Sequence, residues 1–461
     1  MSDGQCILPA DDTGRVFDRI AGLAQVIRPE DIQHALAATG RVNARPCRLT
    51  HEVVLWIVLA MGIFTGVPIR QVFKLCRKFR VGERSPHRSS LCVARQRLGV
   101  APVRFLYEHT VRPLARPDTP GAFAFGFRLV GIDGTVLDVP DSAANAAAFD
   151  RPSGKRGAGA FPQVRKLSLV ELGTHAELGI AIKSIRCGER TMVPGLLRHL
   201  TSEMLLLVDQ GFFSEKLWRQ WAERRVNVLA RVTTQMILKP KLVLPDGSYL
   251  PKVYKGDYNR EKDRDGVVVR VIRYTLDDPQ RVGHGEEHVL ITTLLDAALY
   301  PALELIGLYH ERWEHELTFD EQKTHQDPRR PGKPTPLRSE TPAGVIQEIY
   351  ALSLAHFVIR SLMFEAAATV GLDPDRLSFT GCFQVLKCRL PECDATTPAT
   401  LEAWYRRLLW EMQDERTDPR RNRINPRVIR KQVSNWKKKR PAHRNLPPLK
   451  KTFRETVVMT R

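Results

Sequence analysis

The sequence predicts an α/β protein whose strand-rich core is interrupted by a β-rich insertion, with an all-helical domain before the core and a basic region after it. Helical periodicity with Pro and Gly punctuation runs from about residue 14 to residue 116. Short apolar runs of the strand type follow from about residue 125. The excess of Lys and Arg is concentrated after residue 416. These three observations carry the prediction.

The N-terminal domain is predicted over residues 1–116. Its last basic segment, SSLCVARQRLG, begins with serines and carries Arg95 and Arg97 on a short helix. Such a helix could enter a DNA groove. Short basic helices are common, so a helical domain that only packs is about as well supported, and both interpretations stay open.

The core is predicted in two parts, residues 117–234 and residues 299–375. The first part holds a strand in FRLVGIDGTVLDVP, two further strands that short connections make antiparallel, and a strand–turn–helix unit from MLLLVD onward. The second part holds the helix YHERWEHELTFDEQK and a long apolar helix expected to buttress it. Residues 235–298 are strand-rich, with turn signals at Asp246–Gly247 and Asp265–Gly266, and are predicted to form the insertion.

Two aspartates are predicted to lie within or at the ends of buried strands. Asp133 is surrounded by apolar residues, and Gly134 after it offers a close backbone approach. An acid in such a strand is costly unless a cation or a metal pairs with it. Asp209 ends the run MLLLVD and precedes a turn and a helix. That order places its carboxylate at the C-terminal edge of a sheet, where α/β active sites collect.

A third acid, Glu316, belongs to a predicted helical stripe. Five residues are spaced by three, four, three and four positions, which at about 100° per residue aligns them along one side of a helix. They are Tyr309, Arg312, Glu316, Phe319 and Lys323. A carboxylate between two cations suits a metal ligand beside a phosphate, whereas Glu311 and Glu314 fall off the stripe. Surface ion pairs are the usual cause of such spacing, so the two aspartates are what favour the metal.

Asp133, Asp209 and Glu316 together form a credible ligand set for hard divalent ions, which prefer carboxylate oxygen. No comparable constellation supports a Ser, Cys or His nucleophile. Three histidines surround the glutamate at scattered helical phases, so surface or supporting roles are expected for them. They are His310, His315 and His325.

The net charge of +20 favours a polyanionic partner, most simply nucleic acid. The predicted C-terminal region, residues 376–461, carries most of this excess, with 16 Lys and Arg against two acids from residue 416 onward. Apolar residues interleave with the charges of INPRVIRKQVSNWKKKRP, which favours a docking surface for DNA or for a second subunit over a plain solvated tail. The candidate phosphate contacts there are Lys437, Lys438 and Lys439. Such contacts give affinity without base specificity.

The compartment predicted from the sequence is the cytosol. The first residues lack the basic and apolar regions of a signal peptide, and the best apolar run, VVLWIVLAMGIF, is too short to cross a membrane. The eight cysteines are scattered without a CxxC pair and are expected to be reduced. These observations argue against a secreted disulfide-rich protein and against a membrane protein.

The chain resembles bacterial insertion-sequence transposases of the Asp-Asp-Glu type, in the large family named after insertion sequence four. The family's signature of four residues is matched by Tyr309, Arg312, Glu316 and Lys323. Its two catalytic aspartates are matched by Asp133 in IDGT and Asp209 in VDQGFFS. Softer matches flank these positions, and the N-terminal helices also resemble those of the family, so the resemblance covers nearly the whole chain.

The resemblance implies a ribonuclease-H-like catalytic core interrupted by the β insertion. It also implies a cut-and-paste DNA transposase, which cleaves the ends of its insertion sequence and joins the 3′ ends to target DNA by metal-dependent phosphodiester hydrolysis and transesterification. Asp133, Asp209 and Glu316 are then the catalytic residues and the ligands of two Mg²⁺ ions, with Mn²⁺ as an alternative.

The same resemblance implies the partners. Arg312 and Lys323 are expected to neutralise phosphate oxygens of double-stranded DNA, and Tyr309 to donate a hydrogen bond to the same backbone. The DNA is the terminal inverted repeats and the target, bound by a homodimer. No membrane is expected, and the location is a bacterial cytoplasm, in association with the nucleoid when DNA is bound.

Two departures from the family pattern bear on this expectation. Many relatives carry a basic residue directly after the second aspartate, where this chain has Gln210. Some relatives place a Trp in the insertion to hold a flipped base during hairpin formation, but this chain has no Trp from Ala222 through Arg312. Two alternatives to a transposase stay open: a plain metal-dependent nuclease, and a non-enzymatic or inactive DNA-binding protein derived from a transposase.

Overall fold

The computed structural model divides the chain into two compact units. Unit 1 comprises Met1–Pro120, Asp133–His199 and Glu314–Thr417, and unit 2 comprises Gly121–Ile132, Leu200–Trp313 and Asp418–Arg461. The residues that the structure describes are 19–43, 47–79, 81–154, 157–236, 238–279, 281, 283–327, 337–418, 428–429, 437–438 and 451–460.

The N-terminal part of unit 1 is helical, as the periodicity predicts. Its helices are η2 (Ala21–Gln25), α2 (Pro29–Ala38), α3 (His51–Ile63), α4 (Ile69–Cys76), α5 (Arg88–Leu98) and α6 (Ala101–Thr110). The Thr50 side chain caps α3 by accepting a hydrogen bond from the Val53 amide. Every residue from Val53 to Ile63 is buried, because α3 runs through the middle of the hydrophobic core.

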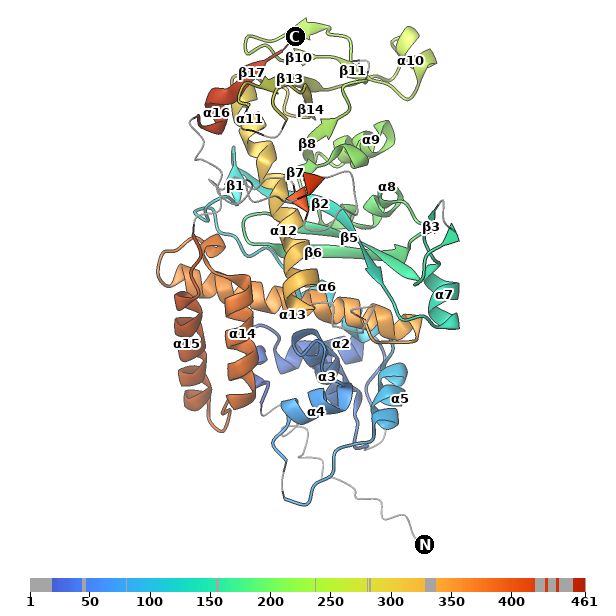
Figure 1. Ribbon diagram of the computed structural model, residues 1–461, viewed down its shortest axis with the longest axis vertical. Helices are drawn as coiled ribbons and strands as arrows, with labels where there is room; N and C mark the ends of the chain where they lie inside the picture. The colour runs from blue at the N-terminus through green and yellow to red at the C-terminus, as the bar shows by residue number, and fades with distance from the viewer. Residues whose placement is uncertain are drawn as a thin grey trace. The chain divides into compact units, whose positions relative to one another are not determined.

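The long helix α13 (Pro342–Ala368) completes this core (Figure 1). It packs on α3 so closely that a Cβ at Gly62 would overlap the carbonyl oxygen of Ala351. The helices α14 (Phe379–Arg389) and α15 (Pro398–Asp414) pack against each other and against α13. The N-terminal helices therefore share one hydrophobic core with α13, α14 and α15, whereas the sequence alone suggests separate domains.

By length and composition α13 could cross a membrane, which the sequence prediction of no such stretch did not anticipate. However, 72% of its most apolar window is buried inside the protein. That burial is what the core helix of a globular unit requires.

The strands of unit 1 lie in the order β6-β5-β2, where β6 is Ala176–Ser184, β5 is Gln163–Glu171 and β2 is Phe127–Asp138. β5 and β6 are antiparallel, as their short connection predicts, with Val164 opposite Ser184. Residues Asp133–Asp138 of β2 belong to unit 1, and the preceding half of the strand belongs to unit 2. Between β2 and β5 the chain forms α7 (Ala143–Phe149) and the short pair β3 (Ser153–Gly154) and β4 (Gly157–Ala158).

The region from the end of β6 to His199 is less regular than predicted. The run MVPGLLRHL contains the end of α8 (Glu189–Met192) and the short 3-10 turns η3 (Val193–Gly195) and η4 (Leu197–His199), instead of one continuous helix. Pro194 lacks the amide hydrogen that a continuing helix needs, and Gly195 weakens it further.

The strands of unit 2 lie in the order β2-β7-β8-β14-β13-β10-β9. The first half of β2 runs parallel to β7 (Met204–Val208), which runs parallel to β8 (Asn227–Val232). The helix α9 (Glu215–Glu223) connects β7 to β8, as the strand–turn–helix pattern predicts. β1 (Phe123–Ala124) pairs with the start of β2.

The residues predicted to form a β insertion do form strands, and these extend the sheet of unit 2. β14 (His288–Thr292) pairs with β8, and β13 (Arg270–Leu276) pairs with β14, both antiparallel. The remaining short elements are β9 (Leu242–Val243), β10 (Tyr249–Leu250), β11 (Lys252–Val253), α10 (Asp257–Glu261) and β12 (Val267–Val268). Near the C-terminus, α16 (Phe453–Thr456) leads into β17 (Val457–Met459), which pairs with β13. β15 (Val428–Ile429) pairs in parallel with β16 (Lys437–Lys438).

Candidate active site

Asp133 is half-buried on β2 in unit 1, where the sequence predicts a strand. Its Oδ1 accepts a hydrogen bond of 2.7 Å from the amide of Gly134. Thr135 lies two positions further along and therefore on the same face of the strand. The Nζ of Lys323 donates to Thr135 Oγ1 at 2.8 Å. The structure thus holds one predicted cation, Lys323, against the face of β2 that carries the first predicted aspartate.

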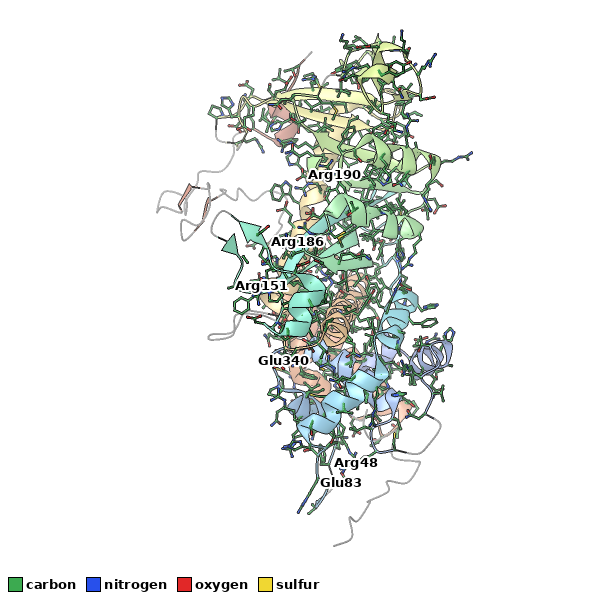
Figure 2. All side chains as sticks on the ribbon, turned by 90° about the vertical axis from the view of Figure 1, so that its right-hand side faces the viewer. Arg48, Glu83, Arg151, Arg186, Arg190 and Glu340 are labelled. Carbon is green, nitrogen blue, oxygen red and sulfur yellow. The ribbon has the colours of Figure 1, made fainter. Side chains whose placement is uncertain are left out.

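The opposite face of β2 at this point is closed by a carboxylate that the sequence did not single out. A Cβ at Gly134 would overlap the side chain of Glu189 in its present position, so a larger residue would require that side chain to move. Glu189 Oε1 accepts from Arg165 Nη1 at 2.6 Å. Figure 2 shows the exposed residues Arg186, which follows β6, and Arg190, which lies on α8, on the side of unit 1 that faces the viewer.

The predicted stripe does not lie on one regular helix. The chain forms α11 (Ala302–Tyr309), the 3-10 turn η6 (His310–Arg312), α12 (Trp313–Asp320) and the π-helical segment η7 (Glu321–Gln326). Tyr309 and Arg312 belong to unit 2, and Glu316 and Lys323 to unit 1. Both a 3-10 turn and a π turn change the angle per residue, so the uniform 100° phase holds only within α12.

Several side chains anchor α12 and η7 to the strands of unit 1. His315, next to Glu316, is fully buried, and its Nε2 lies 3.0 Å from Ser168 Oγ on β5. Gln322 Oε1 accepts from the buried Lys166 Nζ at 2.8 Å, also from β5. His315 therefore has the supporting role expected from its phase, but in the interior of the unit. These contacts fix the segment that carries the half-buried Glu316 against β5.

Asp209 directly follows β7 in unit 2, where the sequence predicts the end of a strand. It is half-buried, and the preceding Val208 pairs in register with Ile132 on one side and with Ala230 on the other. Because β8 is parallel to β7, Arg231, which follows Ala230 on β8, comes at the level of Asp209. On β2, Ile132 is followed in the sequence by Asp133, which belongs to unit 1.

Arg231 is a cation that sequence reasoning missed. It is half-buried on β8, in register with Leu290 of β14. Gln210 stands directly after Asp209, and the parallel pairing of β7 with β8 brings Arg231 to the level of Asp209. Only strand register reveals this, because 22 positions separate Asp209 from Arg231 in the sequence.

Tyr309 and Arg312 are both buried in unit 2. The Tyr309 hydroxyl donates to the carbonyl oxygen of Val208 at 3.2 Å, so its predicted hydrogen bond to DNA would require this bond to break. Burial raises the pKa of Tyr309 well above its usual value, the charge of Arg312 opposes this, and that of Asp209 adds to it. The Arg312 guanidinium lies 5.3 Å from the centre of the Trp313 ring. Both signature residues therefore flank the end of β7 in this unit.

The other predicted DNA contacts differ in their surroundings. Arg95 is buried in unit 1, where its guanidinium contacts Gln347 at 3.2 Å and Glu348 at 3.5 Å, so it has a packing role and is not available to DNA. Arg97, on the same helix, is exposed. Lys437 and Lys438 form β16, and Lys439 lies outside the described residues.

The described residues contain one more group with metal-ligand chemistry, formed by His175, Glu314 and Asp375 of unit 1. Their ligand atoms lie within 4.8 Å of one another. His175 is fully buried and occupies the turn between β5 and β6 with a φ of 57°, a left-handed conformation uncommon for a residue with a Cβ. Sequence reasoning set Glu314 aside because it falls off the stripe, and nothing in the spacing pointed to His175.

An α/β core with one half-buried aspartate within β2 and another directly after β7, with a cation on β8 and one on the helical segment η7, suits an enzyme that acts on phosphodiesters. The comparisons with known proteins agree. The description "Insertion element 4 transposase N-terminal" matches residues 18–108, and "Transposase DDE domain" matches residues 125–357.

A similar protein extends this finding. Transposase InsG for insertion sequence element IS4 of Escherichia coli (strain K12) is 28% identical over 427 residues, which are 91% of this chain and 93% of that protein. Among solved structures, the cryo-EM structure of the piggyBac transposase synaptic complex with hairpin DNA aligns over 86% of this chain and 85% of that chain, with a TM-score of 0.41 and 13% identity.

The chain belongs to the DDE transposases of the insertion-sequence-four family. It is a DNA transposase with a ribonuclease-H-like α/β core, an enzyme of DNA cleavage and strand transfer. The family and the reaction predicted from the sequence are confirmed.

Proposed function

We propose that Asp133, Asp209 and Glu316 are the catalytic metal ligands, and that the enzyme cuts the ends of its own insertion sequence and joins the 3′ ends to target DNA. The observation that carries this proposal is the register of β2 and β7. Ile132 and Val208 are partners in parallel strands, and a half-buried aspartate follows each of them. Two carboxylates that are held close together repel each other unless a cation joins them, so the proposal includes a metal site.

The donor set suits Mg²⁺, with Mn²⁺ as an alternative, because all three ligands are carboxylates and hard divalent ions prefer oxygen. When bound, two such ions would lower the pKa of the attacking water or 3′ hydroxyl and stabilise the leaving oxygen. Asp133, Asp209 and Glu316 would supply the negative charge that retains them.

The cations of the chain would act on the DNA phosphates. Lys323, held by Thr135 on β2, would neutralise phosphate oxygens of the DNA. Arg312 would do the same in unit 2, and Arg231 on β8 would take over the contact that relatives make with the residue after the second aspartate. Tyr309 would chiefly position the end of β7 through its bond to Val208.

The finer expectations from the resemblance belong to this proposal. The DNA partners would be terminal inverted repeats and target DNA, bound by a homodimer, with residues 235–298 as the insertion into the catalytic core. The exposed Arg97, together with Lys437, Lys438 and Lys439, would provide further phosphate contacts. The location would be a bacterial cytoplasm, on nucleoid DNA.

The test uses purified protein, Mg²⁺ and a labelled duplex that carries the DNA flanking the gene. Wild type is compared with Glu316→Gln, and Asp320→Asn serves as the matched control. Asp320 is an exposed acid of the same helix, so the control makes the same change of charge away from the strands. We expect cuts at the repeat boundary and joined products from wild type and Asp320→Asn, and none from Glu316→Gln. Chelation of the metal should abolish both activities.

The other outcomes separate the alternatives. Cleavage without joining or end preference would replace the proposal with a plain nuclease. DNA binding without cleavage by the wild type would indicate an inactive, transposase-derived binding protein. Full activity of Glu316→Gln would refute the assignment of the third ligand. Closed hairpins among the products would show that cleavage proceeds through a hairpin although the insertion lacks Trp.

A further inference from the structure

A buried ion-pair network lies under the helical segment that carries Glu316 and Lys323. At its centre is Glu321, the first residue of η7, whose side chain is 5% exposed. Its Oε1 accepts from His175 Nδ1 at 3.0 Å, and its Oε2 accepts from His356 Nε2 at 3.0 Å and from Arg360 Nε at 2.9 Å. The Arg360 Nη2 also contacts Oε1. One carboxylate thus receives donors from the β5–β6 turn and from two turns of α13.

His175 connects two points of the glutamate helix. Its Nδ1 faces Glu321, and its Nε2 lies 2.8 Å from Glu314 Oε2. Glu314 and Glu321 are seven residues apart and stand on either side of Glu316 in the sequence. Because both imidazole nitrogens face carboxylates, a doubly protonated ring satisfies both bonds at once. The ring therefore ties the two ends of the segment to a single point on the β5–β6 turn.

The network coincides with the change from α-helix to π-helix. α12 ends at Asp320 and the π-helical segment begins at Glu321. π turns are rare and are less favourable than α-helix, so tertiary contacts must hold them. A buried carboxylate with charged donors on three sides permits few other positions, because any slip would leave a buried charge without its partner. The contacts of Glu321 are therefore suited to fix the residue at which the winding changes.

The residue at which the winding changes, Glu321, determines where Lys323 lies relative to Glu316. A continuous α-helix would advance Lys323 by about 100° per residue, and a π turn advances it by less. In the structure, Lys323 reaches Thr135 on β2, two residues after Asp133. Loss of the π register would rotate Lys323 away from this strand and change its position relative to Glu316.

We propose that Glu321, His175 and Arg360 are positioning residues of the transposase, which hold the glutamate helix in its π register and so keep Glu316 and Lys323 over the strand that carries Asp133. This inference rests on the proposed function of Glu316 as a metal ligand. It adds to that function a group of residues that touch neither metal nor DNA.

The geometry argues against a metal in the same cluster. His175, Glu314 and Asp375 could be arranged around an ion, but the Arg360 guanidinium contacts His175 Nδ1 and would repel a divalent cation. Burial and the charge of Arg360 lower the pKa of His175, whereas Glu321 and Glu314 outweigh them and raise it to about 9.

The experiment measures the Mg²⁺ concentration for half-maximal cleavage by full-length protein on the flanking duplex. Glu321→Gln keeps the shape of the side chain and removes its charge. Glu348→Gln is the matched control, since Glu348 is a buried carboxylate of α13 paired with Arg95 and belongs to the same unit. Each rate is divided by the folded fraction from thermal unfolding. We expect about a tenfold or larger rise in the required Mg²⁺ for Glu321→Gln, the usual effect of losing a residue that orients a metal ligand, and no rise for the control.

A second variant guards against misfolding of the first. His175→Gln retains one amide donor and can contact only one of the two carboxylates, so a smaller rise in required Mg²⁺ is expected. An unchanged Mg²⁺ dependence in both variants, or an equal rise in Glu348→Gln, would overturn the positioning role. Failure of the proposed function would look different, because Glu316→Gln would then remain active whatever the two variants do.

Discussion

The charge of the buried His175 predicts a pH dependence of stability in a defined window. Its pKa is about 9 in the folded protein and 6.5 in the unfolded chain. A group whose pKa is raised by folding stabilises the fold fully below the unfolded pKa and loses that contribution as pH rises through the folded pKa. The network should therefore be intact below pH 6.5, and its contribution should be lost as pH rises through about 9.

The magnitude follows from the size of the shift. One pKa unit corresponds to about 1.4 kcal/mol, so a shift from 6.5 to about 9 corresponds to on the order of 3 kcal/mol. Four other groups face the ring: Glu314, Glu321, Arg360 and Asp375. Burial raises the pKa of Asp375 to about 6, and Arg360 with His175 outweighs burial to hold that of Glu321 well below its usual range. Glu321 therefore remains ionised across the window, and Asp375 is mostly ionised at pH 6.5 and fully ionised above it.

The assay compares urea unfolding of wild type and His175→Gln at pH 6.5 and pH 10. Tyrosine, lysine and cysteine side chains elsewhere titrate in both proteins, so their effects cancel in the difference between the two. We expect wild type to be the more stable at pH 6.5 and its advantage to shrink by about 3 kcal/mol at pH 10. A difference that stays constant, or one that grows with pH, would refute the assignment of a charged ring between two carboxylates.

Two further predictions concern unit 1. Gly62→Ala should lower the stability measured by thermal unfolding by about 1–3 kcal/mol, because its Cβ would overlap the Ala351 backbone where α3 crosses α13. Gly188→Ala is the control and should have little effect, since there is open space around Gly188. Equal melting temperatures of the two variants would contradict the close packing of α3 on α13. Arg97→Gln should weaken binding to any duplex. It should also reduce the slope of log affinity against log salt concentration by about one unit, whereas Arg95→Gln should lower the stability of the fold and leave the DNA affinity per folded molecule unchanged. The reverse pattern in a salt titration would overturn both assignments.

The strand-end aspartates could be predicted because their signals are local. Asp133 and Asp209 each follow or interrupt a short apolar run, and such runs form strands in most contexts. The buttress under the glutamate helix was also predictable, since a long apolar helix needs a core to cover. It is confirmed by His356 and Arg360 of α13, which contact Glu321.

The residues that could not be identified from the sequence act through contacts with residues that are far away along the chain. His175 and Glu321 are separated by 146 positions, and neither has a motif or a helical phase that marks it. Arg95 looks like a surface cation because its neighbours are polar, but Gln347 and Glu348 on α13 bury it. Periodicity arguments assume one angle per residue, so they also missed the 3-10 and π turns within the signature.

Unit 1 is assembled from three separate stretches of the chain, and this has a consequence for its synthesis on the ribosome. The last stretch, Glu314–Thr417, contains the helix α13 that covers the apolar surface of α3. A growing chain that has reached residue 313 therefore exposes that surface and is prone to aggregation until α13 emerges. Under the proposed function such a chain has both aspartates but no third ligand and no positioning network. Prematurely terminated products should consequently be unable to cut the chromosome, so that the order of the segments acts as a safeguard for the host.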